Sequence, residues 1–176
     1  MHIVSHAVHR SLVIARHARA EAHDPPRDLT RHLCQEGRWQ AEAVGGELAQ
    51  TGWAPQLALV SVAARTRETW EIVARSGGFD GSAEFLDSLY GGWVPDMIDA
   101  IHAVDDGVTH LLLIGHEPAT SATAAWLAGP GSDEAALCRV RRGLPTGGRA
   151  HLSYSGPWSE IAATRAQLTG FAKPGV

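Results

Sequence analysis

The stretch Leu12-Val13-Ile14-Ala15-Arg16-His17-Ala18-Arg19 decides how the rest of the sequence is interpreted. It begins with a short aliphatic run that is too brief for a buried helix. Such a run is typical of a central strand buried on both faces. The run stops at Arg16 and His17, a permanent cation followed by an imidazole. In open α/β sheets, ligands bind in the crevice at the carboxyl ends of the strands. We therefore expect a binding site directly after this strand.

Two later segments repeat this arrangement of an apolar strand followed by polar residues. The predicted strand at 56–60 ends at Ser61, and Arg65 follows one turn into a predicted helix. The clearest strand of the sequence, at 109–114, ends at Gly115-His116 immediately before another predicted helix. Because the carboxyl ends of parallel strands lie on one edge of the sheet, we expect all these polar residues to converge. Helix N-termini at the same edge would add unpaired N–H groups that suit an anion.

Strands and helices alternate along most of the chain. This alternation predicts a three-layer α/β/α sandwich with a mostly parallel central sheet, in a single domain covering 1–176. Asp24-Pro25-Pro26 lies in a stretch, 18–35, that is expected to be a polar loop without regular structure. Helices are predicted at 36–51, 64–75, 94–104 and 118–128, and further strands at 83–86, 149–154 and 158–162, while the segment 129–142 is left unassigned.

The N-terminal residues 1–9 are expected to form a loosely held leader. Its histidines, His2, His6 and His9, lack the acidic or cysteine partners that a metal site would need. No apolar stretch there is long enough for a signal peptide or a membrane span. We therefore expect a cytoplasmic protein.

The composition excludes several classes of protein. The chain has 176 residues, of which 44% are hydrophobic and 19% charged, as in globular domains. Its formal net charge of −4 gives no electrostatic case for binding nucleic acid or a membrane. Cys34 and Cys138 lie far apart without metal-ligand spacing, which favours a reducing compartment over a disulfide framework.

The residues at the three strand ends are those that phosphoryl transfer requires. Charge spreads over the equatorial oxygens of the phosphoryl group, so catalysis consists mainly of positioning and electrostatic stabilisation. Arg16 and Arg65 can clamp a phosphate bidentately, and no metal is then needed to neutralise it. His17 is the candidate nucleophile, and nearby arginines should lower its pKa from about 6.5. His116 is expected to donate to phosphate oxygens. We predict no cofactor and no metal, since the sequence holds neither a Walker A loop nor a metal-ligand cluster.

Arg16-His17-Ala18 resembles the Arg-His-Gly signature of the histidine phosphatase superfamily, which includes the phosphoglycerate mutases. The segment Ser61 to Thr69 is similar to that family's Ser-Pro-x-x-Arg-Ala-x-x-Thr element, although Val62 and Thr66 replace the proline and the alanine. Gly115-His116-Glu117-Pro118 resembles the element that carries the second catalytic histidine. The short chain, together with Arg16-His17-Ala18-Arg19-Ala20-Glu21, resembles the small SixA-type phosphohistidine phosphatases.

The resemblance implies a phosphoglycerate mutase-like fold without a cap domain and a metal-independent phosphatase. It implies a phosphohistidine intermediate on His17, clamped by Arg16, Arg65 and His116. Further substrate-binding candidates are Ser61, Arg19, which either lines the pocket rim or pairs in solvent, and Arg31, with Arg27 as its alternative for reaching the phosphate.

The resemblance also implies a general acid after the third strand, where Asp87 and Glu84 are the candidates. Asp87 is preferred because it lies directly before the predicted turn at 88–91. A weak acid would favour N–P substrates, since a protonated phosphohistidine can leave as neutral imidazole whereas an alkoxide needs a proton. By analogy with larger members of that superfamily, which cover the pocket with a helical cap, a pocket without a cap would admit a phosphorylated side chain of another protein. Protein phosphohistidine is therefore the expected substrate. A small phosphorylated metabolite and a non-catalytic phosphate-binding adaptor module are the alternatives.

Overall fold

The computed structural model describes residues 8–175, which build one six-stranded sheet with the order β3-β2-β4-β1-β5-β6. The pairs β3–β2, β2–β4 and β4–β1 are parallel, whereas β1–β5 and β5–β6 are antiparallel. The mostly parallel sheet predicted from the sequence is thus confirmed. The strands are β1 (His9–Arg16), β2 (Leu57–Ser61), β3 (Ser82–Leu86), β4 (His110–Gly115), β5 (Arg149–Ser155) and β6 (Gln167–Ala172).

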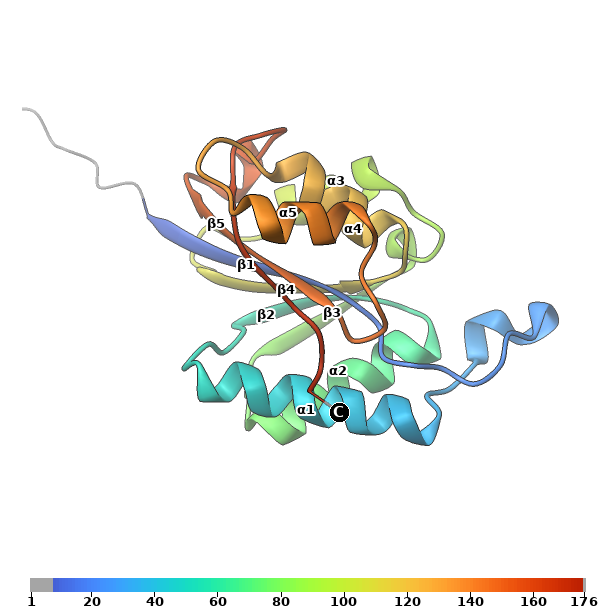
Figure 1. Ribbon diagram of the computed structural model, residues 1–176. Coiled ribbons are helices and arrows are strands. Elements are labelled where there is room, and N and C mark those ends of the chain that lie inside the picture. Colours follow the sequence, from blue (N-terminus) through green and yellow to red (C-terminus); the bar gives the residue numbers. More distant parts are fainter. Residues whose placement is uncertain (1–7, 176) are drawn as a thin grey trace, which may run out of the picture.

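Helices cover both faces of this sheet and make the three layers of the predicted sandwich (Figure 1). One face carries α1 (Gln35–Gln50) and α2 (Ala64–Gly77). The opposite face carries α3 (Val94–His102), α4 (Ala119–Leu127) and α5 (Glu134–Arg141). Short 3₁₀ helices lie at Pro25–Thr30 (η1), Asp87–Leu89 (η2) and Trp158–Glu160 (η3). No helix in the described part of the chain is long and apolar enough to cross a bilayer.

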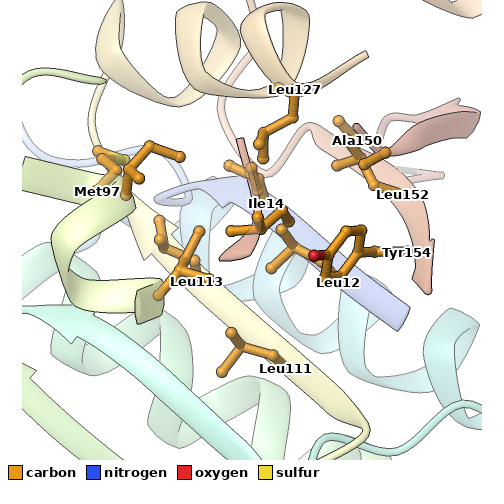
Figure 2. Packing of buried hydrophobic residues seen from close by; sticks show 14 of the residues in the cluster. Leu12, Ile14, Met97, Leu111, Leu113, Leu127, Ala150, Leu152 and Tyr154 are labelled. Carbon is orange, nitrogen blue, oxygen red and sulfur yellow. The ribbon is translucent and has the colours of Figure 1, made fainter. Parts of the chain in front are cut away.

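The apolar run of β1 is buried on both faces because helices cover both sides of the sheet. Leu12 and Ile14 pack toward α3 and α4, among the side chains that Figure 2 shows. Val13 and Ala15 face the opposite way and pack among residues of α1 and α2. Each fully buried aliphatic side chain of this size stabilises the fold by roughly 1.5–3 kcal/mol. This double burial fixes where β1 ends, and therefore where Arg16 and His17 emerge.

The strand register brings the carboxyl ends of three strands level with one another. Arg16 at the end of β1 pairs with Gly115 at the end of β4. Val60 of β2 pairs with Ile114 of β4, so that Ser61 ends its strand beside Gly115. His17, Arg65 and His116 each follow within a few residues of these ends. The sheet therefore delivers residues that are far apart in sequence to one edge.

One predicted strand is wrong. The segment at 158–162 contains η3 and an extended stretch outside the sheet, and the last strand is β6. The Trp158 backbone N–H donates to Asp106 Oδ1 at 2.9 Å, and the indole N–H donates to the Val108 carbonyl at 2.7 Å. The Trp158 backbone N–H is therefore not available to a neighbouring strand, and the indole hydrogen bond holds the side chain at Val108.

Other segments also differ from expectation. The loop expected at 18–35 contains η1, because Pro25 and Pro26 fit the first turn of a short helix. The unassigned segment 129–142 contains α5, whose first turn is capped by the Asp133 carboxylate. His9 belongs to β1 and not to a leader. Val8 is exposed and outside β1, and the rest of the predicted leader, residues 1–7, lies outside the described residues.

Candidate active site

His17 lies at the base of the candidate site and is held by its own backbone and ring contacts. Its backbone N–H donates to the Gly115 carbonyl at 3.1 Å, and its carbonyl accepts from the Gly147 N–H at 3.0 Å. The ring atom Nδ1 lies 2.7 Å from the Ala18 carbonyl oxygen, which can only accept. Nδ1 therefore carries the proton, and Nε2 keeps its lone pair. The residue is only 7% exposed, so its ring orientation is well fixed.

Arg65, His116 and Ser61 form a hydrogen-bonded chain beside this histidine. Arg65 Nη2 lies 3.3 Å from His116 Nδ1, and His116 Nε2 lies 2.8 Å from Ser61 Oγ. Since the guanidinium can only donate, His116 Nδ1 accepts and its proton sits on Nε2. The His17 and His116 ring centroids are 5.3 Å apart. The structure thus brings together residues that follow β1, β2 and β4.

Arg16 has fewer partners than a guanidinium can use. Its Nη1 donates to the Leu144 carbonyl at 3.0 Å. The buried Nε–H groups of Arg16 and Arg65 have no acceptor among residues 8–175. Burial lowers the pKa of Arg16, the negative charge of Glu117 raises it, and the positive charge of Arg65 lowers it further. Two cations with unused N–H donors beside two imidazoles form an environment that favours an anion.

Both histidines are held neutral. Burial lowers the pKa of His17 to about 3, although the Ala18 carbonyl opposes the shift, and the positive charges around it lower the pKa further. Burial lowers the pKa of His116 to about 4, with Arg65 as the next cause. The sequence predicted this direction for His17 from nearby arginines, but desolvation is the larger cause. A neutral His17 with a free Nε2 is the form that a nucleophile requires.

A carboxylate that the sequence analysis did not identify, that of Asp28, contacts this group of side chains. The group, called the cluster below, consists of Arg16, His17, Ser61, Arg65 and His116. Asp28 Oδ2 accepts from Arg65 Nη2 at 3.2 Å and from the Tyr90 hydroxyl at 2.9 Å, while Oδ1 accepts from Arg31 Nη2 at 3.1 Å. Its backbone carbonyl also accepts from Arg65 Nη1 at 2.7 Å. Partial burial would raise the pKa of Asp28, but the hydrogen bonds from Tyr90 and the arginines, with the charge of Arg65, lower it to about 2.

Asp28 was missed because it comes from η1, within a segment expected to be an unstructured loop. The one signal in the sequence was its i, i+3 spacing to Arg31, which suits an ion pair on a helical turn. Tyr90 was also missed. Its ring centroid lies 5.8 Å from that of His116, and this contact joins a turn after β3 to a loop after β4. Neither contact can be inferred from local sequence.

Of the three arginine candidates in the segment after β1, one lies near the cluster and two lie on the exposed surface. Arg31 approaches the cluster through Asp28. Arg19 instead pairs with Glu36 at 2.8 Å on the exposed surface. Arg27 is exposed, and its closest acidic partner in the described chain is Asp24, at 3.9 Å.

The two acid candidates, Glu84 within β3 and Asp87 directly after it, make no hydrogen bond or ion pair with the cluster in the described residues. Asp87 is exposed in η2, and within residues 8–175 its carboxylate makes no hydrogen bond or ion pair. Glu84 is exposed beside α3, near Asp96 and Asp99. The described residues contain no group of three or more His, Cys, Asp or Glu side chains placed to hold a metal ion.

Comparisons with known proteins agree with this geometry. The family model of the histidine phosphatase superfamily (branch 1) matches residues 12–91. The uncharacterized protein Rv1276c of Mycobacterium tuberculosis is 38% identical over 160 residues, which cover 90% of this chain and 99% of that protein.

Solved structures agree as well. The structure of the SixA phosphohistidine phosphatase proposed for Nakamurella multipartitia has a TM-score of 0.84 and 31% identity, and the match covers 97% of this chain and 99% of that one. A second proposed SixA, from Agrobacterium tumefaciens, has a TM-score of 0.77 and 28% identity over 94% of this chain and 98% of its own. The chain therefore belongs to the histidine phosphatase superfamily, among its SixA-type members.

Proposed function

We propose that this chain hydrolyses protein phosphohistidine, without a metal, through a phosphohistidine intermediate on His17. The coarser activity, that of a phosphatase, follows from the family. The observation that carries the finer proposal is the state of His17. It is buried and neutral, with Nε2 unprotonated, beside Arg16, Arg65 and His116. No other ring nitrogen of this cluster combines a free lone pair with a location among unused cationic donors.

The chemical step follows from this arrangement. His17 Nε2 attacks phosphorus, the new P–N bond forms, and the bond to the leaving group breaks with its electron pair going to the leaving atom. Arg16 and Arg65 stabilise the charge on the equatorial oxygens, and His116 Nε2–H donates once it turns from Ser61 to the phosphoryl group. Their positive charge supplies the role that a metal ion has in other phosphoryl-transfer sites. Water then attacks phosphorus, Nε2 recovers its electron pair, and the proton lost by water passes to solvent.

The choice of an N–P substrate rests on the acids near the cluster. An alkoxide leaving group needs a proton in the transition state, which general acids normally supply for a gain of about 10²–10⁴-fold. Asp28, with a pKa of about 2, is ionised at neutral pH and has no proton to give. Asp87 is exposed, and within the described residues its carboxylate makes no hydrogen bond or ion pair with the cluster. A phosphohistidine with a proton on its other ring nitrogen leaves as neutral imidazole and needs no acid.

The test compares substrates and follows the intermediate. Wild type is expected to hydrolyse a phosphohistidine peptide faster than a phosphoserine peptide or sugar phosphates, and to hydrolyse an activated aryl phosphate as well. Acid quenching, followed by mapping of the labelled phosphoryl group, should place it on His17. His17→Ala should abolish both activities while remaining folded by circular dichroism.

Other outcomes select the alternatives. A preference for a sugar phosphate would favour the metabolite phosphatase, and binding of phosphate without any turnover would favour the adaptor module. Full activity of His17→Ala would remove the proposed nucleophile. Activity that survives chelation and is not raised by added Mg²⁺, Mn²⁺ or Zn²⁺ is expected, and an absolute need for one of these ions would contradict metal independence.

A further inference from the structure

Asp28 and Tyr90 connect two loops across the ends of β2 and β4, the strands that Arg65 and His116 follow. Asp28 lies on the segment after β1, and Tyr90 on the turn after β3. In the sheet, β2 and β4 lie between these two strands. The 2.9 Å hydrogen bond from the Tyr90 hydroxyl to Asp28 Oδ2 therefore joins loops from either side of β2 and β4. Figure 1 shows the segment with η1 extending past the carboxyl edge of the sheet.

The Asp28–Tyr90 pair lies on the solvent side of the cluster. His17 at the base is 7% exposed, whereas Tyr90 is 37% exposed and the Asp28 side chain 22%. The phosphoryl group must lie between the His17 nucleophile and its leaving group, because the attacking and leaving atoms are roughly in line. With His17 at the buried end, the leaving group departs toward solvent, on the side where Asp28 and Tyr90 lie.

The structure already places an imidazole on the Asp28 carboxylate. His23 Nδ1 lies 3.4 Å from Asp28 Oδ1, on a side chain that is 66% exposed and can be displaced. The other groups that face this carboxylate are Arg31 on Oδ1, and Arg65 and Tyr90 on Oδ2. A carboxylate has about four acceptor positions, so Oδ1 can accept one further N–H donor beside Arg31.

We propose that Asp28 is a specificity-determining residue whose carboxylate accepts a hydrogen bond from the ring N–H of the substrate's phosphorylated imidazole. The ring takes the position that His23 holds in this structure. This inference rests on the proposed function and adds to it the residue that selects the leaving group. Asp28 favours a cationic imidazole and disfavours an ester oxygen, which brings no N–H donor and would carry negative charge toward the carboxylate.

The proton and electron balance of the step is simple. The substrate ring carries the phosphoryl group on one nitrogen and a proton on the other. When His17 Nε2 attacks, the P–N bond to the substrate breaks and its electron pair returns to the substrate ring, which leaves as neutral imidazole with its proton in place. Asp28 remains ionised throughout, which agrees with a pKa of about 2. Because an adjacent negative charge raises the pKa of a cationic ring, Asp28 also keeps the bound substrate protonated to higher pH.

The experiment measures kcat/KM of wild type and Asp28→Asn on a phosphohistidine peptide and on an aryl phosphate. Loss of a hydrogen bond to a charged group is expected to lower the rate on phosphohistidine about 10- to 100-fold. The rate on the aryl phosphate should fall by much less, so that the ratio of the two rates collapses. In a profile of kcat against pH, the alkaline limb for phosphohistidine should move to lower pH in Asp28→Asn.

Asp24→Asn is the matched control. It removes the same charge from the same segment, but Asp24 pairs only with exposed Arg27 in the described chain. It should leave the ratio of rates and the alkaline limb as in wild type. Tyr90→Phe keeps the carboxylate while removing the bridge between the loops, and it should preserve most of the phosphohistidine preference.

Two results would overturn the assignment. Equal losses on both substrates in Asp28→Asn, with an unmoved alkaline limb, would reduce Asp28 to a residue that only positions Arg65. A loss of preference in Tyr90→Phe as large as in Asp28→Asn would assign the selectivity to the loop bridge instead. Failure of the proposed function looks different, because wild type would then show no preference for phosphohistidine in the first place.

Discussion

The two ends of β1 carry arginines, buried at the amino end and half-buried at the carboxyl end, that differ in how their Nη donors are satisfied. The Nε–H of each lacks an acceptor within residues 8–175. At the amino end, Arg10 is 3% exposed. Its Nη1 donates to the Gly156 carbonyl at 2.7 Å, and its Nη2 donates to the Asp106 carbonyl at 2.7 Å and to Asp106 Oδ1 at 3.1 Å. At the carboxyl end, the Arg16 guanidinium makes one hydrogen bond within residues 8–175, to the Leu144 carbonyl, and faces the like charge of Arg65.

This difference distinguishes a structural arginine from a binding arginine. A buried polar group that lacks partners costs about 1–3 kcal/mol, so the acceptors that surround the Nη atoms of Arg10 stabilise the fold. The carboxyl end retains unsatisfied cationic donors and two neutral imidazoles, an arrangement that lowers stability until an anion binds. The same strand therefore serves packing at one end and chemistry at the other.

Exchanging each arginine for Met would test this comparison most strongly. Arg16→Met should lower kcat/KM about 10²–10³-fold, since it removes a donor to the developing phosphoryl charge, with little change in Tm. Arg10→Met should leave kcat/KM near the wild-type value and destabilise the fold by about 2–4 kcal/mol, because the Gly156 and Asp106 acceptors lose their donors. Thermal unfolding and steady-state kinetics of both variants provide the measurements. A large Tm loss in Arg16→Met with normal kinetics would invert the comparison.

Acid titration of the wild-type protein should show the effect of the two neutral histidines at the carboxyl end of β1 on the free energy of unfolding. His17 and His116 have folded pKa values of about 3 and 4, below the unfolded value of about 6.5. Between these values the unfolded chain binds protons that the folded chain does not, so stability falls as pH drops below about 6.5. Each such histidine contributes a slope of up to about 1.4 kcal/mol per pH unit.

Urea unfolding at several pH values from 7 to 4.5 would measure this slope. His116→Gln should reduce it, because glutamine does not titrate. His151 supplies the control, since burial and Arg149 lower its pKa to about 4 at a place outside the cluster. His151→Gln should reduce the slope similarly while retaining activity. An unchanged slope in both variants would mean that these histidines bind protons equally in the folded and unfolded states.

The smallest effect is expected at Asp87, the acid that sequence reasoning preferred. Its exposed carboxylate makes no hydrogen bond or ion pair with the cluster in the described chain. Asp87→Asn should slow ester hydrolysis by about tenfold or less, against the 10²–10⁴-fold that a full general acid contributes. Phosphohistidine hydrolysis should change less, because its leaving group needs no proton. An equal loss on both substrates would remove the selective role of Asp87.

The sequence predicted the part of the site that strand ends position. A short aliphatic run buried on both faces can only be a central strand in this kind of fold, and parallel strands end on one edge. These two rules were enough to group Arg16 and His17 with Arg65 and His116. The conformation of a segment whose hydrogen-bond partners lie far away in the sequence could not be predicted in this way, as the wrong strand at 158–162 shows. Its backbone hydrogen bond goes to Asp106, which only the folded chain brings near.

The sequence by itself determined the layers, the parallel sheet and the residues at its carboxyl edge, because local hydrophobic periodicity fixes strands and their ends. Only the tertiary structure decided which side chains from the loops reach that edge. Asp28 and Tyr90 come from separate loops, and they contact each other only when both loops pack against the folded sheet. The hydrogen-bond partners that orient His17, and the burial that keeps it neutral, likewise exist only after long-range packing has expelled water.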